Sequence, residues 1–162
     1  MDKIKAAVLT ASDRCASGAT EDISGAEVLR ILEENGYAVV EKRIVSDDMD
    51  ALKAALTELS DKASLVITTG GTGFSLRDNT PEATMAVADK NAPGIAEYIR
   101  MRSAQITDRA MLSRGVSVIR KNTLIINLPG SVKAVRESMG FIMGALPHAL
   151  AVLSGNVKDC GR

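Results

Sequence analysis

The sequence predicts one α/β domain in three layers, with a mainly parallel sheet covered by helices on both faces. Short apolar runs rich in β-branched residues alternate with segments whose apolar residues recur at helical spacing. Capping or turn residues separate the two kinds of segment, as expected for strand–helix–strand units. The length of 162 residues suits a single domain, and no repeat, low-complexity tract or linker divides it. We therefore assign residues 1–162 to one domain, with residues 155–162 as a polar tail.

The first expected elements are a strand and a helix. Residues 4–11 form an apolar run typical of a buried strand. Ser24, with Glu27 three residues later, makes a capping box that predicts the start of a helix. This helix should end at Asn35 and Gly36, which are typical of a C-terminal stop.

A second strand, a helix and a third strand follow. Residues 39–45 include charged side chains and indicate a strand near an edge of the sheet. Apolar residues recur at helical spacing from Met49 to Leu59. Residues 64–69 form a short β-branched run, which predicts a buried strand ending at the glycine-rich residues 70–73.

Helices and a pair of strands fill the second half. Thr80 is expected to cap a helix, with Pro81 at the first helical position, and another helix should begin near Pro93. Residues 115–119 and 123–128 are predicted strands joined by a polar turn. A final helix presents the following apolar side chains on one face: Val132, Val135, Met139, Ile142, Met143, Leu146, Leu150 and Leu153. Pro147 should kink this helix.

Ligands of an open parallel sheet bind beyond the carboxyl ends of its strands. Polar residues 12–14, 70–78 and 127–131 each follow a predicted strand. We therefore expect these three segments to meet in one crevice.

Composition narrows the class of function. Lys and Arg together number 20 and equal Asp and Glu, so a basic face for nucleic acid is not expected. A local cluster of cations for one small anion remains compatible with this balance. We find no signal peptide or membrane-spanning stretch, and Cys15 and Cys160 lack a metal-ligand spacing, so we expect a reduced, cytoplasmic protein that binds no membrane.

Gly70, Gly71 and Gly73 give the most informative loop. Glycines let the backbone approach a ligand closely, and the amides of such a loop can bind phosphate oxygens. A tight turn that needs glycine for geometry alone is an equally good explanation of the loop by itself. The following Arg77 and Asp78 add charge and favour a site. The P-loop and dinucleotide-binding patterns are both absent from the sequence.

Asp47 and Asp78 are the candidate acids. Each precedes a predicted helix, and two carboxylates together with substrate phosphates are a usual way to hold Mg²⁺. Helix capping is the alternative, and it is the better explanation for Asp47 on spacing alone, since Asp48 lies beside it. His148, the one histidine, is expected to be a structural or surface residue and not a base.

The turn at residues 128–131 is a candidate anion site. Ser131 can cap the final helix, and Lys133 lies in its first turn. An ordinary turn between a strand and a helix would explain the same residues without a ligand. Ser113 and Arg114 precede a predicted strand in a similar polar context.

Together these segments resemble the molybdopterin-binding family, which includes Mog-type molybdopterin adenylyltransferases, MoaB proteins and the G domain of gephyrin. The stretches that carry the resemblance are residues 10–14 (TASDR), 45–48 (VSDD), 69–83 (TGGTGFSLRDNTPEA), 111–114 (MLSR) and 124–130 (LIINLPG). They occur in the family's order and span almost the whole chain.

The resemblance implies a reaction in molybdenum cofactor biosynthesis. Molybdopterin attacks the α-phosphorus of Mg-ATP and yields adenylyl-molybdopterin and pyrophosphate. The resemblance also implies a homotrimer and a downstream metal-insertion protein. It assigns Asp47 and Asp78 as the catalytic, Mg²⁺-holding acids. The pterin, phosphate and nucleotide contacts that it implies are Ser12, Gly70, Gly71, Thr72, Gly73, Ser113, Asn127, Pro129, Gly130, Ser131 and Lys133.

This chemistry suits the residues present. The nucleophile is already an anion and needs little help from a general base, so charge neutralisation and alignment should dominate. An alternative follows from the turn PGSVKA (residues 129–134), which is similar to MoaB proteins and would imply a molybdopterin carrier without turnover. A gephyrin-like scaffold is a weaker third reading, because no linker or second domain accompanies the motif.

Overall fold

Six strands form one sheet in the computed structural model, which describes residues 2–157. The strands are β1 (Lys5–Ala11), β2 (Ala38–Val45), β3 (Leu65–Thr69), β4 (Lys90–Asn91), β5 (Ser117–Arg120) and β6 (Thr123–Leu128). Their spatial order is β2-β1-β3-β6-β5-β4. The first four strands run parallel, whereas β5 and β4 are antiparallel to their neighbours. The predicted mainly parallel sheet is confirmed, with β2 at an edge.

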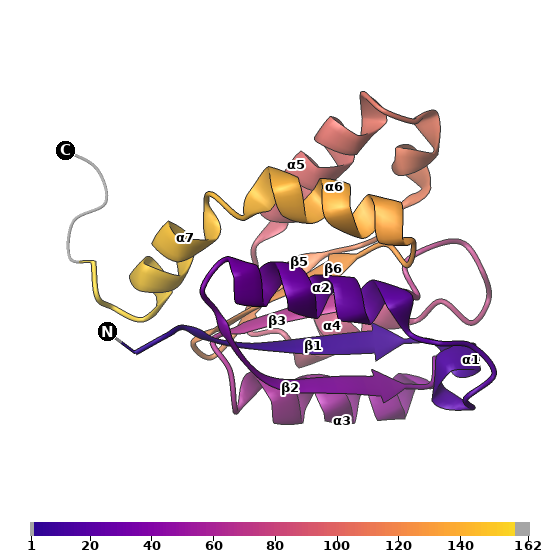
Figure 1. Ribbon diagram of the computed structural model, residues 1–162, viewed down its shortest axis with the longest axis horizontal. Coiled ribbons are helices and arrows are strands. Elements are labelled where there is room, and N and C mark those ends of the chain that lie inside the picture. The colour runs from indigo at the N-terminus through magenta and orange to yellow at the C-terminus, as the bar shows by residue number, and fades with distance from the viewer. Residues whose placement is uncertain (1, 158–162) are drawn as a thin grey trace.

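Helices cover both faces of this sheet (Figure 1). They are α1 (Asp13–Ala16), α2 (Ile23–Glu34), α3 (Met49–Ser60), α4 (Thr80–Val87), α5 (Pro93–Ala104), the 3-10 helix η1 (Asp108–Leu112), α6 (Val132–Ile142) and α7 (Leu146–Leu153). One apolar core joins the sheet to α2, α5, α6 and α7, and a second joins it to α3 and α4. The three-layer prediction is therefore confirmed.

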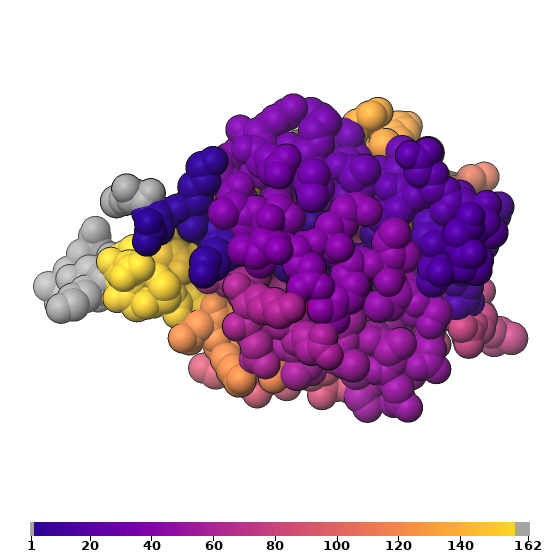
Figure 2. Space-filling view, turned by 60° about the horizontal axis from the view of Figure 1, so that its bottom comes forward, coloured from indigo at the N-terminus to yellow at the C-terminus, as the bar shows by residue number. Residues whose placement is uncertain are grey.

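Alternation along β1 explains how one strand serves both cores. Ala6 and Val8 lie in the core under α2 and α6, whereas Ala7 and Leu9 lie in the core over α3. Successive side chains of a strand point to opposite faces, so a strand covered on both sides must be apolar throughout. The edge strand β2, buried on neither face along most of its length, lies with α2 and α3 in the indigo and purple surface of Figure 2.

Two predicted helix starts are wrong by one or two residues. Helix α2 is capped by Asp22, whose Oδ1 accepts from the Gly25 amide at 2.9 Å, and not by Ser24. Asp22 also binds Thr10 and Lys42, so tertiary contacts decide between two capping candidates. Helix α4 has Asn79 at its N-cap, which places Thr80 inside the helix.

Short elements escaped prediction, and the last helix is broken rather than kinked. Helix α6 ends at Ile142 and α7 begins at Leu146, with Pro147 in its first turn, because proline cannot donate the helical hydrogen bond. Helix α1, strand β4 and η1 are too short to show a periodicity. His148 lies exposed on α7, and Cys160 lies outside the described residues.

Within residues 2–157, the longest apolar helices fall short of the length and hydropathy that crossing a bilayer requires.

Candidate active site

The three polar segments that follow β1, β3 and β6 meet at the carboxyl edge of the sheet. Arg77 donates from Nε and Nη2 to the two carboxylate oxygens of Asp13, at 3.0 and 2.8 Å. The Thr69 hydroxyl donates to the Pro129 carbonyl at 2.8 Å. Helices α2 and α3 leave the sheet on opposite faces around β1, so a crevice opens here, as in other doubly wound sheets. The expected convergence is confirmed.

Two glycines make this close approach possible. Gly70 and Gly71 have φ values of 89° and 67°, which side chains rarely tolerate. A Cβ at Gly70 would strike the Ala11 carbonyl. A Cβ at Gly71 would strike the Thr80 hydroxyl and lie 3.1 Å from Oδ1 of Asp47. Steric need thus accounts for both glycines, and it also brings the loop against a candidate acid.

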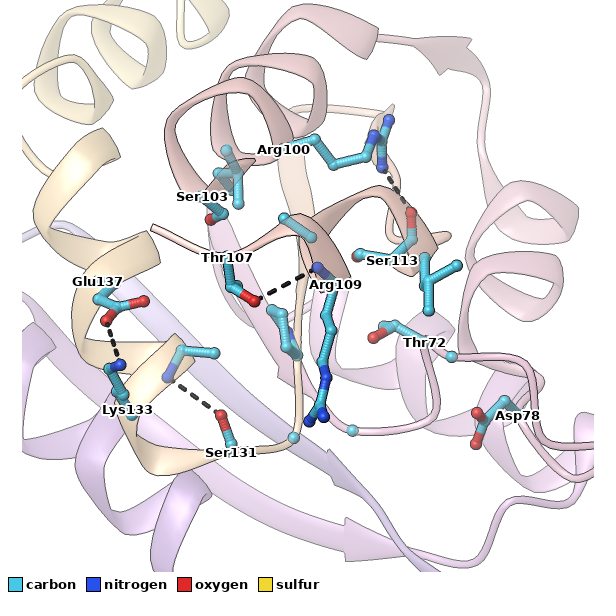
Figure 3. A pocket seen from close by; sticks show the side chains of 18 of the residues that line it. Thr72, Asp78, Arg100, Ser103, Thr107, Arg109, Ser113, Ser131, Lys133 and Glu137 are labelled. Carbon is cyan, nitrogen blue, oxygen red and sulfur yellow. Dashed lines mark hydrogen bonds and ion pairs between the residues drawn. The ribbon is translucent and has the colours of Figure 1, made fainter. Parts of the chain in front are cut away.

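A cavity of about 610 Å³ opens beside this loop (Figure 3). Its walls come from the glycine loop, the start of α6 and the α5–η1 segment. The predicted site residues that line it are Gly70, Gly71, Thr72, Gly73, Asp78, Ser113, Pro129, Gly130, Ser131 and Lys133. Ser12, Asp47 and Asn127 are the predicted site residues that do not.

Ser12 lines a second cavity, of about 380 Å³, on the other side of Gly70 and Gly130. Its hydroxyl accepts from the Cys15 amide at 3.1 Å and caps α1. Both cavities share Gly70, Gly130 and Ser131, so a ligand larger than either cavity can extend across this loop.

Asn127 has a different position from the one expected. Its side chain is buried and donates to the hydroxyls of Thr68 and Thr84, each at 3.0 Å. Its Oδ1 accepts from the Val116 amide at 3.2 Å. Both amide hydrogens are therefore occupied within the protein. Asn127 supports the strand ends beneath the site and has no donor left for a ligand.

Asp47 is held by a reciprocal pair of hydrogen bonds with Asp13. The Asp13 amide donates to Oδ2 of Asp47, and the Asp47 amide donates to Oδ1 of Asp13, both at 3.0 Å. Asn79 donates from Nδ2 to the Asp47 carbonyl at 2.9 Å. The remaining carboxylate oxygen, Oδ1, is buried without a hydrogen-bond partner among residues 2–157.

Electrostatics sets Asp47 apart from ordinary surface acids. Burial raises the pKa of its carboxyl above the usual 3.8; the Asp13 amide opposes this shift, and the charges of Asp13 and Asp78 add to it. The hydrogen bonds from Arg77 and from the Asp47 amide lower the pKa of Asp13. A buried carboxylate oxygen near two other acids favours a cation as its missing partner.

Capping does not explain Asp47. Its neighbour Asp48 caps α3, since Oδ2 of Asp48 accepts from the Ala51 amide at 2.9 Å. Asp78 is likewise not the cap of α4, and its Oδ2 accepts from the Ser75 amide at 3.2 Å. Asp78 lines the cavity, on the side away from Lys133 in Figure 3. The structure thus leaves both acids available for another role.

Arg114 is a site residue that sequence reasoning left out. It donates from Nε to the Gly73 carbonyl and from Nη2 to the Asp78 carbonyl, each at 2.8 Å, and it pairs with Glu82. Its amide also donates to the Thr72 carbonyl at 2.8 Å. One side chain therefore ties both ends of the loop that carries Asp78. The motif at residues 111–114 marked this arginine, but only the structure identifies its acceptors.

The start of α6 forms the opposite wall. The Ser131 hydroxyl accepts from the Ala134 amide at 3.1 Å, which confirms the predicted cap. Lys133 is mostly exposed and lies 3.7 Å from Glu137. The first amides of a helix lack intrahelical acceptors and attract anions. This wall therefore suits a phosphate.

A metal ion held by protein side chains alone is not indicated. Within residues 2–157, no three or more His, Cys, Asp and Glu side chains are grouped to hold one. A hard divalent cation needs only one or two carboxylates when substrate phosphates supply further oxygens. The unpartnered Oδ1 of Asp47 fits that donor set.

Comparisons with known proteins find a matching family and similar structures. Residues 7–148 match a family described as a probable molybdopterin binding domain. A molybdopterin adenylyltransferase from Helicobacter pylori (strain J99) is 41% identical over 160 residues, covering 96% of this chain and 91% of that protein. Another, from Escherichia coli (strain K12), is 40% identical over 144 residues, covering 86% and 73%. The crystal structure of the molybdopterin biosynthesis enzyme MoaB from Thermus thermophilus has a TM-score of 0.88 at 38% identity, covering 94% and 97%.

Proposed function

This chain belongs to the family of probable molybdopterin binding domains, and from that premise we propose that it transfers the adenylyl group of ATP to molybdopterin. Identity of about 40% to molybdopterin adenylyltransferases over most of the chain supports this assignment. The observation that carries the proposal is Oδ1 of Asp47, which is buried beside the glycine loop with no hydrogen-bond partner in the part of the chain that the structure describes.

The reaction joins two anions. A phosphate oxygen of molybdopterin attacks the α-phosphorus of ATP, the bond from that phosphorus to the β-phosphate oxygen breaks, and pyrophosphate leaves. The attacking oxygen is already negatively charged, so a histidine base is not needed. Repulsion between the phosphates is the main obstacle, and fixed positive groups in a pocket lower it.

We propose that Asp47 and Asp78 hold Mg²⁺ when ATP binds. The ion would neutralise phosphate charge there. The chain's own contribution is positioning: Asp13 fixes the Asp47 carboxylate, and Arg114 fixes the loop that carries Asp78. The glycine loop and the start of α6 both line the cavity, with Gly130 next to Gly70, and their amides can align two phosphates side by side.

A labelled-substrate assay tests the proposal. Purified protein is incubated with molybdopterin, Mg²⁺ and ATP labelled at the α-phosphate. We expect label in a pterin product together with release of pyrophosphate. Binding of molybdopterin with no pyrophosphate release would instead support the second candidate, a MoaB-like binding protein, which the match to MoaB and the turn at residues 129–134 favour.

We further propose a homotrimer that hands its product to a separate metal-insertion protein, as the resemblance implies. Large apolar side chains are exposed on the α5–η1 segment, including Met101 (56%), Ile106 (48%) and Met111 (72%). Exposed apolar side chains gathered on one segment are typical of an interface. Light scattering after size-exclusion chromatography measures the assembly, and a monomeric mass at micromolar protein would contradict the trimer.

A further inference from the structure

Three cations line the large cavity, and they differ in what they bind. Arg100 donates from Nη1 to the Gly115 carbonyl at 2.6 Å and to the Ser113 carbonyl at 3.4 Å. Lys133 lies 3.7 Å from the Glu137 carboxylate. The Arg109 guanidinium has no hydrogen-bond or ion-pair partner within residues 2–157, and its backbone amide donates to the Thr107 hydroxyl at 3.3 Å.

The backbone that carries Arg109 is attached to the site at its C-terminal end. Thr107 caps η1, accepting from the Arg109 amide at 3.3 Å. After η1, the Arg114 amide donates to the Thr72 carbonyl at 2.8 Å, and Arg100 binds the carbonyl of Ser113. Arg109 is thus presented from a segment fixed against the glycine loop.

The side chain of Arg109 extends into the cavity. In Figure 3 it runs from η1 across the opening between Thr72 and Ser131. The opposite wall holds Ser131, Lys133 and the first turn of α6, an 11-residue helix. The carboxylates in the cavity are Asp78 and Glu137, and Arg109 binds neither. The Arg109 guanidinium pairs with neither acid and faces the N-terminus of a helix, so it is placed to bind an anion of the ligand.

Arginine matches phosphate in shape as well as charge. Its planar group can donate two parallel hydrogen bonds to two phosphate oxygens. The first amides of α6 and the Lys133 ammonium group would bind the same anion from the other wall. Arg109 is exposed to solvent, so its position between η1 and the start of α6, and not burial, favours a bound anion.

We propose that Arg109 is a phosphate-binding residue that contacts a substrate phosphate from the side opposite α6. The inference rests on the proposed function for the identity of the substrates. Both substrates carry phosphate, so the shared chemistry is a phosphate group of ATP or of molybdopterin. Its charge would add to that of Lys133 where the two anions approach each other.

The test compares Arg109→Gln and Arg109→Lys with the wild-type protein and with the control Lys90→Ala. Lys90 is an exposed cation on β4 outside the cavity, so the control also removes a positive charge. Calorimetry measures the Kd of Mg-ATP and of molybdopterin separately, and thermal melting checks folding. Arg109 belongs to a turn with no buried residues, so we expect its variants to fold.

We expect Arg109→Gln to raise the Kd of at least one substrate about tenfold or more, the effect of losing a hydrogen bond to a charged group. Arg109→Lys should recover part of the affinity, and Lys90→Ala should bind like the wild type. Weaker binding of Mg-ATP would assign the contact to a phosphate of the nucleotide, and weaker binding of molybdopterin would assign it to the pterin phosphate.

Unchanged Kd values for both substrates in Arg109→Gln would overturn the inference, whatever the transfer assay shows. An equal loss in Lys90→Ala would also overturn it, because net charge would then be the cause. A wild-type protein that binds both substrates but releases no pyrophosphate would refute the transfer proposal. The two Kd measurements would still decide the role of Arg109.

Discussion

The loop after β2, which carries Asp47, and the loop after β3, which carries Asp78, place the same type of side chain by different means. Asp47 follows its strand directly and is held by backbone hydrogen bonds with Asp13. Asp78 follows a longer excursion in which Phe74 is 69% and Leu76 fully exposed. Side chains tie that excursion down: Arg77 binds Asp13, and Arg114 binds the loop's carbonyls.

This difference suits the two carboxylates to different functions, one to holding a cation and the other to contacting the substrate. Asp47 has a fixed orientation and a buried, unpartnered oxygen, so it can meet a cation with little loss of entropy. Asp78 is half-buried, as Asp47 is, but it lines the cavity, where it can meet a substrate. We therefore expect Asp47 to matter most for the rate and the Asp78 loop to respond to the side chains that hold it.

The largest effect is expected for Asp47→Asn. The neutral amide cannot attract a cation to the buried position, and transfer should fall about 10³-fold. The rate of labelled adenylyl-pterin formation measures this. Asp48→Ala is the control: it removes the cap of α3 at a cost of about 1 kcal/mol but should keep transfer. Equal loss of transfer in both variants would mean that Asp47 acts through the structure of the loop.

Asp78→Asn should lower transfer about 10²-fold, less than Asp47→Asn because the Asp78 carboxylate lines the open cavity, where solvent screens its charge. The amide can still accept from the Ser75 backbone, so the melting temperature should stay unchanged. Asp50→Asn, at an acid that is almost fully exposed on α3, is the matched control. Unfolding of Asp78→Asn would show that Asp78 is structural, and the comparison between the loops would fail.

Arg114→Gln tests whether the Asp78 loop depends on its side-chain ties. Loss of the bonds to the Gly73 and Asp78 carbonyls should let the loop shift and reduce transfer about tenfold, with about 1 kcal/mol lost in unfolding free energy. Rates and urea unfolding measure the two effects. None of the hydrogen bonds lost in Arg114→Gln involves Asp47. The pKa of Asp47 should therefore stay raised in the variant.

The smallest effect is on the pH dependence of stability. The pKa of Asp47 is raised in the folded state above its usual 3.8, so the folded protein binds this proton more tightly than the unfolded chain does. Stability of the wild type should therefore fall as pH rises from 3.8 through the raised value, and Asp47→Asn should lack this component. Asp13, whose pKa is lowered, contributes in the opposite direction in both proteins. Urea unfolding at a series of pH values from about 4 upwards, starting near the usual pKa of an aspartate, measures the difference between the two proteins, and identical profiles would contradict the buried position of Asp47.

Local sequence patterns predicted most helices and strands but few of the hydrogen-bond partners of their side chains. The β-branched run of β3 and the cap at Ser131 were confirmed, because each depends on neighbouring residues. The start of α2 was misplaced, since Thr10 and Lys42, distant in sequence, stabilise Asp22 at the cap. The placement of Asn127 differed for the same kind of reason: its donors face Thr68 and Thr84, which no spacing in the sequence connects to it.

The sequence by itself determined the α/β class, the glycine loop, the candidate acids and the family resemblance, because these depend on residue type and on order along the chain. Tertiary structure alone decided that Asp48 caps α3 while Asp47 keeps a buried oxygen without a hydrogen-bond partner among residues 2–157. It also decided that Arg109 lines the cavity with no partner in the same range, while Arg114 binds the carbonyls of Gly73 and Asp78. Side chains of the same type differ here only in the groups that the folded sheet and its loops bring within hydrogen-bond distance.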